Sequence, residues 1–150
     1  SMFKAVKRIV DEFEDVKVIY PVHLNPKVQD TAEEVLGSSE RIKLVNPMDV
    51  IDFHNFLNRA YMILTDSGGI QEEAPSLGKP VLVMRDTTER PEGVEAGTLR
   101  LVGTKEQDIY DNFKQLLTDK SEYEKMSMAK NPYGDGRASE RIVSILEKEL

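Results

Sequence analysis

Apolar residues recur along the chain in two alternating patterns, one typical of helices and one typical of short buried strands. Apolar positions three or four residues apart predict amphipathic helices, and short unbroken apolar runs predict strands buried on both faces. The predicted helices cover residues 3–13, 26–36, 49–60, 109–117, 121–129 and 138–150, with one more short helix after Gly69. The predicted strands cover residues 16–20, 42–45, 61–64, 80–84 and 99–102, and residues 85–98 are predicted to form a polar loop.

This order of elements predicts an α/β fold, a Rossmann-like parallel sheet with helices on both faces. The length of 150 residues suits one domain, so a single domain is expected over residues 1–150. Open parallel sheets bind ligands at the carboxyl ends of their strands. The loops after Tyr20, Leu64 and Met84 are therefore the places where functional residues are expected.

Composition narrows the range of functions. The balance of 39% hydrophobic and 31% charged residues is that of a folded globular domain, and the net charge of −7 disfavours nucleic acid as a partner. Without cysteine there is no disulfide or thiol nucleophile, and two distant histidines form no metal cluster, so we expect neither a metal nor a cofactor. Neither a signal peptide nor an apolar run of roughly 18–20 residues is seen, so we expect a cytoplasmic protein without a membrane span.

The strongest local motif is Ser67-Gly68-Gly69, which stands between a buried strand and a predicted helix. Glycines let an anion approach the free backbone N–H groups of a first helical turn, and the serine can cap that helix or donate to a phosphate oxygen. Glu73 follows within two turns, and its carboxylate can accept hydrogen bonds from both hydroxyls of a ribose. The alternative is a capped turn in which Glu72 and Glu73 only favour a helix start.

Four longer runs resemble the non-hydrolysing UDP-N-acetylglucosamine 2-epimerases of bacteria. They are YPVHLNP at 20–26, TDSGGIQEEAPSLG at 65–78 continuing into PVL at 80–82, RDTTERPE at 85–92 and NPYGDG at 131–136. These runs stand in the order that the family shows and extend over nearly the whole chain, so together they are far more specific than the glycine pair alone.

The resemblance implies a two-domain enzyme of the glycosyltransferase-B type, with its active site between the domains and with this chain as the UDP-binding C-terminal domain. The family interconverts UDP-N-acetylglucosamine and UDP-N-acetylmannosamine by eliminating UDP to an enzyme-bound 2-acetamidoglucal and adding it back to the opposite face. By the family pattern, Ser67 and Gly68, with the adjoining Gly69, match phosphate contacts, Glu73 matches the ribose contact and Arg90 matches an arginine beside the diphosphate.

Three side chains keep a second interpretation. Arg90 could be a surface arginine paired with Glu89 or Glu92. His23 matches a family histidine that contacts a second UDP-N-acetylglucosamine, an allosteric effector, but it could equally be a hydrogen-bonded structural histidine. His54 falls among apolar helical positions and is predicted to be a partly buried residue without a chemical role.

The resemblance also implies parts that this chain lacks. The family's His-Arg-Arg-Glu stretch and the acidic residues that move the sugar's proton stand before the point where this chain begins, so no catalytic residue is assigned and the chain alone is expected to be inactive. The full-length protein is expected to be an isomerase of cell-envelope polysaccharide synthesis and a homodimer. The alternatives are the donor-binding domain of a UDP-sugar glycosyltransferase, a hydrolysing epimerase and a UDP-sugar-binding module without catalysis; the run at 87–92 favours the non-hydrolysing epimerase.

Overall fold

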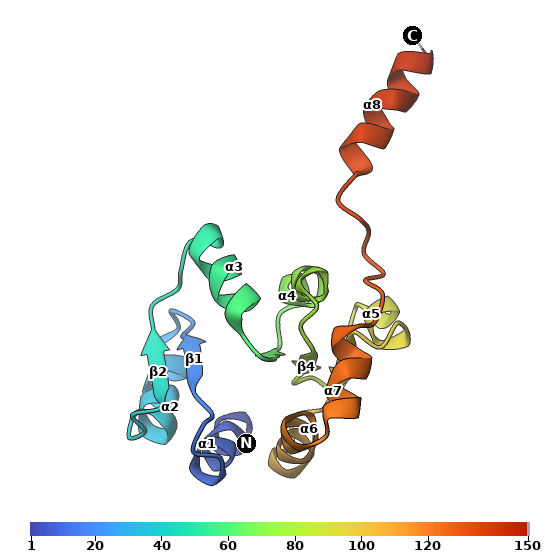
Figure 1. Ribbon diagram of the computed structural model, residues 1–150. Helices are drawn as coiled ribbons and strands as arrows, with labels where there is room; N and C mark the ends of the chain where they lie inside the picture. Colours follow the sequence, from blue (N-terminus) through green and yellow to red (C-terminus); the bar gives the residue numbers. More distant parts are fainter. Residues whose placement is uncertain (150) are drawn as a thin grey trace.

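The computed structural model describes residues 1–149 and shows strands and helices alternating along the chain (Figure 1). The helices are α1 (Met2–Glu12), α2 (Pro26–Leu36), α3 (Val50–Arg59), α4 (Gly68–Glu73), α5 (Pro91–Glu95), α6 (Glu106–Thr118), α7 (Lys120–Ser127) and α8 (Ala138–Glu149), and the 3₁₀ turn η1 (Ala74–Leu77) directly follows α4. The strands are β1 (Val18–Pro21), β2 (Ile42–Val45), β3 (Ile63–Thr65), β4 (Val81–Val83) and β5 (Leu99–Leu101).

Every pair of hydrogen-bonded strands in residues 1–149 is parallel, as the alternation of strand and helix predicts. β1 pairs with β2, and Val18 stands opposite Ile42. The other three strands lie in the order β3-β4-β5, and Val81 in the central strand stands opposite Ile63 and Leu99. The parallel α/β fold is therefore confirmed, with its strands divided into two hydrogen-bonded sheets between β1 and β3.

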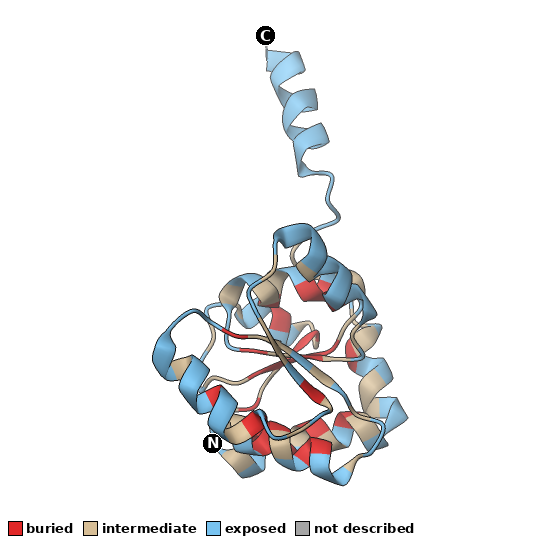
Figure 2. Cartoon of the chain, turned by 90° about the vertical axis from the view of Figure 1, so that its left-hand side faces the viewer, coloured by how far each residue is buried: buried red, intermediate tan, exposed pale blue. Residues whose placement is uncertain are grey.

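Strand β4 shows why helices are needed on both faces of its sheet. Successive side chains of a strand point to opposite faces. Leu82 packs in one core cluster with Ile9 of α1, whereas Val81 and Val83 pack in another with Leu57 of α3. All three residues of β4 are fully buried, and Figure 2 shows the buried strands enclosed by helices. The predicted covering of both faces is thus confirmed.

Helix α1 holds the two sheets together. Ile9 belongs to the core under β4, while Val10, the next residue, packs with Leu36 of α2 and Ile42 of β2. Leu64 of β3 packs against both of these clusters. One amphipathic helix and one strand therefore give the two sheets a shared core.

Most predicted elements are confirmed, two of them with identical bounds at 26–36 and 42–45. Asp49 caps α3 as predicted, because its Oδ1 accepts a hydrogen bond from the backbone N–H of Asp52 at 2.9 Å. The predicted strand at 61–64 is shifted, since Tyr61 is half exposed and the strand runs from Ile63 to Thr65. The first strand likewise begins at Val18, two residues later than predicted.

The polar loop predicted at 85–98 is wrong in one part, because it contains α5. Pro91 at the first helical turn and Glu92 behind it start this helix, as such residues commonly do. Its five residues are too few to show a periodic apolar pattern, so the spacing of apolar positions does not predict this helix. Gly93 is buried in α5 because the side chains of Leu99 and Tyr133 close over it, which ties the run at 131–136 to this helix.

The last helix, α8, stands away from the rest of the chain (Figures 1 and 2). All its residues from 138 to 149 are exposed, including Ile142, Val143, Ile145 and Leu146. The helix predicted at 138–150 is confirmed as far as Glu149; Leu150 lies outside the described residues. Among residues 1–149, none of the helices has both the length and the apolar character that crossing a bilayer requires.

Candidate functional site

The loop after β3 has the geometry predicted for a glycine-rich turn into a helix. Thr65 ends the strand, and its Oγ1 accepts a hydrogen bond from the backbone N–H of Ser67 at 3.0 Å. Ser67 is the N-cap residue of α4, yet its side chain makes no capping hydrogen bond and is exposed. Gly68 and Gly69 form the first turn of α4. Of the two roles open to Ser67, the structure therefore does not show the helix cap, and the contact with a phosphate stays a prediction.

A second loop, after β4, lies against the first. Arg85 Nη1 donates to Glu89 Oε2 at 2.6 Å, and the Glu89 carboxylate occupies the side of Gly68 where a side chain would project. A hydrogen bond from its own backbone N–H, with the nearby charge of Arg85, holds the pKa of the Glu89 carboxyl below its ordinary value. The loop at 85–90 thus places the Glu89 carboxylate, which is paired with Arg85, next to the glycine turn.

Gln71 connects the two loops. Its side chain is fully buried, and its Nε2 donates to the carbonyl oxygen of Ser67 at 3.2 Å. Its Oε1 accepts from the hydroxyl of Thr88 at 2.5 Å, and the same hydroxyl oxygen accepts from the backbone N–H of Arg90 at 3.0 Å. One buried amide therefore fixes the glycine turn relative to the loop that carries Arg90.

Sequence reasoning missed Gln71, although a signal for it exists. Ala74 and Pro75 follow three and four residues later and are buried, so helical spacing places Gln71 on the same inward face. A buried glutamine needs hydrogen-bond partners for its amide. The loops after β3 and β4 supply them, through the Ser67 carbonyl and the Thr88 hydroxyl.

Arg90 lies beside α4. Its Nε donates to the carboxylate of Glu72, and its Nη1 donates to the carbonyl oxygen of Glu89 at 3.1 Å. The alternative prediction, a surface pair with the carboxylate of Glu89 or Glu92, is wrong, because the ion pair is made with Glu72. The guanidinium is therefore held against the short helix that starts at the glycine turn, and its place beside a diphosphate stays a prediction.

Glu73 ends α4 and interacts with a residue for which no role was predicted. His54 Nε2 lies 2.9 Å from Glu73 Oε2. The prediction that His54 is partly buried and without a chemical role is wrong in its first half, since the side chain is 46% exposed and faces Glu73. The apolar stripe of α3 that suggested burial begins only at Phe53, because Val50 is 64% exposed.

His23 lies in the turn between β1 and α2. Its Nδ1 accepts a hydrogen bond from the backbone N–H of Asn25 at 3.1 Å, and Asn25 in turn caps α2 through a bond to the N–H of Lys27 at 3.0 Å. The structure thus gives His23 a place in a local turn, and its contact with an effector stays a prediction. Within residues 1–149, no three histidine, aspartate or glutamate side chains are grouped as a metal site requires.

The chain is a parallel α/β domain in which the loops after β3 and β4 are joined at the carboxyl ends of their strands. At the level of fold alone, the chain resembles the C-terminal domain of a Francisella tularensis group 1 glycosyl transferase, with a TM-score of 0.66 at 18% identity over 88% of this chain and 73% of that one. The family model described as UDP-N-acetylglucosamine 2-epimerase matches residues 1–147, and the chain belongs to that family. The resemblance read from the sequence is therefore confirmed.

Relatives of high identity carry the same name. The chain is 68% identical to UDP-N-acetylglucosamine 2-epimerase of Bacillus subtilis over 146 residues, which are 97% of this chain and 38% of that protein. Among solved structures, it matches S. aureus MnaA in a co-structure with UDP (TM-score 0.93, 59% identity, 97% of this chain and 40% of that chain). It also matches the Neisseria meningitidis UDP-GlcNAc 2-epimerase bound to UDP-GlcNAc (TM-score 0.91, 45% identity, 98% and 40%). The chain thus spans about two fifths of these relatives.

Proposed function

We propose that this chain is the UDP-binding C-terminal domain of a non-hydrolysing epimerase that interconverts UDP-N-acetylglucosamine and UDP-N-acetylmannosamine. The observation that carries the proposal is the joining of two loops by buried Gln71, which brings Ser67, Gly68 and Arg90 to one edge of the sheet. Relatives of this chain have been solved with UDP and with UDP-GlcNAc. Residues 1–150 are proposed to form a single domain.

In the proposed site, the Ser67 hydroxyl and the backbone at Gly68 and Gly69 contact the diphosphate, Arg90 lies beside it, and Glu73 accepts the ribose hydroxyls. UDP is the leaving group of the elimination, so negative charge grows on its phosphates as the bond to the sugar breaks. Hydroxyl, backbone N–H and guanidinium donors that are already in place stabilise this charge without having to reorganise. His23 is proposed to contact a second UDP-N-acetylglucosamine as effector.

We propose that the other half of the reaction depends on residues outside this chain, because the chain spans only about two fifths of the relatives that it matches. The proton at the sugar C2 requires an acid and a base, and none is assigned within this chain, so we expect the chain alone to lack epimerase activity. Exposed Ile142, Ile145 and Leu146 on α8 support an apolar contact with those outside residues. The full-length protein is proposed to be a homodimer.

The glycosyltransferase alternative has less support. The likeness to the F. tularensis glycosyl transferase, at 18% identity, concerns the fold alone, whereas relatives at 54–68% identity, from Escherichia coli and B. subtilis, are named epimerases. The run at 87–92, which favours the epimerase, also provides the contacts of Glu89 with the glycine turn and of Arg90 with α4.

Calorimetric titration with UDP tests the nucleotide site. Ser67→Ala and Glu73→Ala are each expected to weaken UDP binding by about 1–3 kcal/mol, because each removes a polar partner of a charged or strongly hydrogen-bonding group. Ser38→Ala and Glu34→Ala, at exposed positions near and on α2, are the matched controls and should bind UDP like the wild type. Should the unaltered chain not bind UDP, the same four variants are titrated in the full-length protein. Equal binding by all of them there would contradict the site.

Glu89→Gln is expected to raise the affinity for UDP by about threefold. The Glu89 carboxylate lies against Gly68, where the diphosphate is proposed to bind, so its charge repels the ligand in the unaltered protein. Glu95→Gln on α5 makes the same change of charge at an exposed position and serves as the control. A loss of affinity in Glu89→Gln, with Glu95→Gln unchanged, would show instead that Glu89 contacts the ligand favourably.

A further inference from the structure

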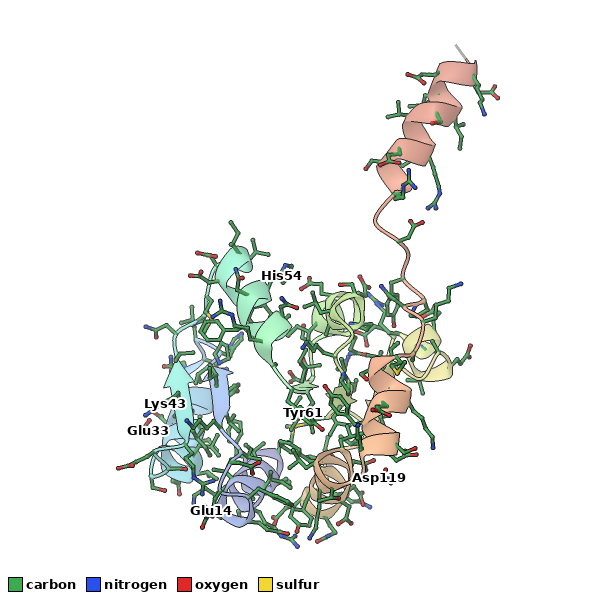
Figure 3. All side chains as sticks on the ribbon, viewed as in Figure 1. Glu14, Glu33, Lys43, His54, Tyr61 and Asp119 are labelled. Atoms are coloured by element: carbon green, nitrogen blue, oxygen red, sulfur yellow. The ribbon has the colours of Figure 1, made fainter. Side chains whose placement is uncertain are left out.

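His54 and Glu73 meet across two helices, although 19 residues separate them in the chain. Figure 3 shows His54 on the part of α3 that faces α4. The imidazole Nε2 lies 2.9 Å from Glu73 Oε2, and both side chains are about half exposed. The contact therefore lies at the surface, next to the loop at 65–69, where a ligand can reach it.

The backbones that carry these two side chains are both anchored. Leu57 of α3 is buried in one cluster with Ala74, the residue after Glu73, and Phe53 packs against that cluster. The Ser76 hydroxyl donates to the Glu73 carbonyl oxygen at 2.6 Å. Helix α3 thus presents His54 to Glu73 from a fixed distance, and the hydrogen bond limits the rotamers of an otherwise mobile carboxylate.

The hydrogen bond also decides which way the carboxylate faces. Oε2 is engaged by His54, and Oε1 lies 3.8 Å from the place where a side chain on Gly69 would begin. The Ser67 hydroxyl oxygen lies 4.0 Å from the same place. Glu73 therefore directs one oxygen towards the glycine turn while His54 holds the other.

We propose that His54 is a positioning residue that holds the Glu73 carboxylate in the orientation needed to accept the ribose hydroxyls, and so contributes to the preference for ribose over 2′-deoxyribose. This rests on the proposed function, in which Glu73 contacts the ribose. A glutamate that is already held in place loses less side-chain conformational entropy when the nucleotide binds. This smaller entropy loss increases the affinity only when both ribose hydroxyls are present to bind the carboxylate.

The experiment compares UDP with 2′-deoxyuridine diphosphate in calorimetric titrations of the full chain. His54→Ala is expected to weaken UDP binding about fivefold and 2′-deoxyuridine diphosphate binding less than about twofold. His54→Gln keeps an N–H donor of similar reach and should recover most of the UDP affinity. Asn55→Ala is the control, because the Asn55 amide donates to the Ile51 carbonyl within α3. This variant should bind both ligands with unchanged affinity.

A double substitution separates this proposal from the function on which it rests. In the Glu73→Ala background, His54→Ala should cause no further loss of UDP affinity, because it acts through Glu73. The proposal is overturned if His54→Ala weakens both ligands by the same factor, or if its effect persists without Glu73. If Glu73→Ala itself leaves UDP binding unchanged, the ribose contact is refuted, and the role of His54 falls with it.

Discussion

Gln71→Glu is expected to lower the free energy of unfolding by about 2–4 kcal/mol and to weaken UDP binding at least about tenfold. In the unaltered chain, the Gln71 amide donates a hydrogen bond to the Ser67 carbonyl oxygen. The substitution keeps the shape of the side chain but places a carboxylate oxygen against that carbonyl oxygen. Because the position is fully buried, the new charge loses its water and also repels the proposed diphosphate. Chemical denaturation and calorimetry measure the two effects.

The pH dependence of this variant follows from the same geometry. Burial raises the pKa of an introduced carboxyl, and its neutral form can donate to the Ser67 carbonyl as the amide does. The stability deficit should therefore be smaller near about pH 5 and grow as the pH rises to about 8. Gln29→Glu, at an exposed position on α2, is the control. A deficit in Gln71→Glu that does not change with pH would contradict the role of the amide donor.

Ile9→Ala is expected to destabilise the chain by about 2–5 kcal/mol, the range for a large-to-small change at a fully buried aliphatic position. Ile9 is fully buried on α1, in the cluster that includes Leu82 and Ile109, and α1 is the helix that joins the two sheets. The shortened side chain leaves a cavity at this junction. Urea denaturation followed by circular dichroism measures the change.

The matched control for that cavity is Ile51→Ala. Ile51 is 71% exposed in the first turn of α3, so the same deletion removes little buried surface and should cost less than about 0.5 kcal/mol. Equal destabilisation of the two variants would mean that α1 does not form the common core of the sheets.

Much of the fold could be predicted because its signals are local. Asn25 before Pro26 marks a helix start, and short apolar runs such as 81–83 mark buried strands. The division of the strands into two sheets could not be predicted, since it depends on whether backbone hydrogen bonds form between β1 and β3, which no side-chain pattern records. Helix α5 was not predicted, because its five residues are too few to show a periodic apolar pattern.

The candidate site was predictable where its residues follow one another. Ser67, Gly68 and Gly69 were located by the turn that they form, and the structure places Arg90 beside the same helix. The contacts that hold the site together were not predictable, because Gln71 meets Thr88 and His54 meets Glu73 only after the chain has folded. Such pairs depend on tertiary packing, so the sequence predicts the residues of the glycine turn but not the side chains that hold them in place.

The exposure of α8 divides the described chain into parts of unequal stability. With all of its side chains from 138 to 149 in solvent, α8 can melt without removing a contact from either sheet. A helix of 12 residues is marginal in water when nothing packs on it, so in this chain α8 is governed by its own helix–coil equilibrium. If a partner surface covered Ile142, Ile145 and Leu146, α8 would unfold together with the two sheets in one cooperative transition.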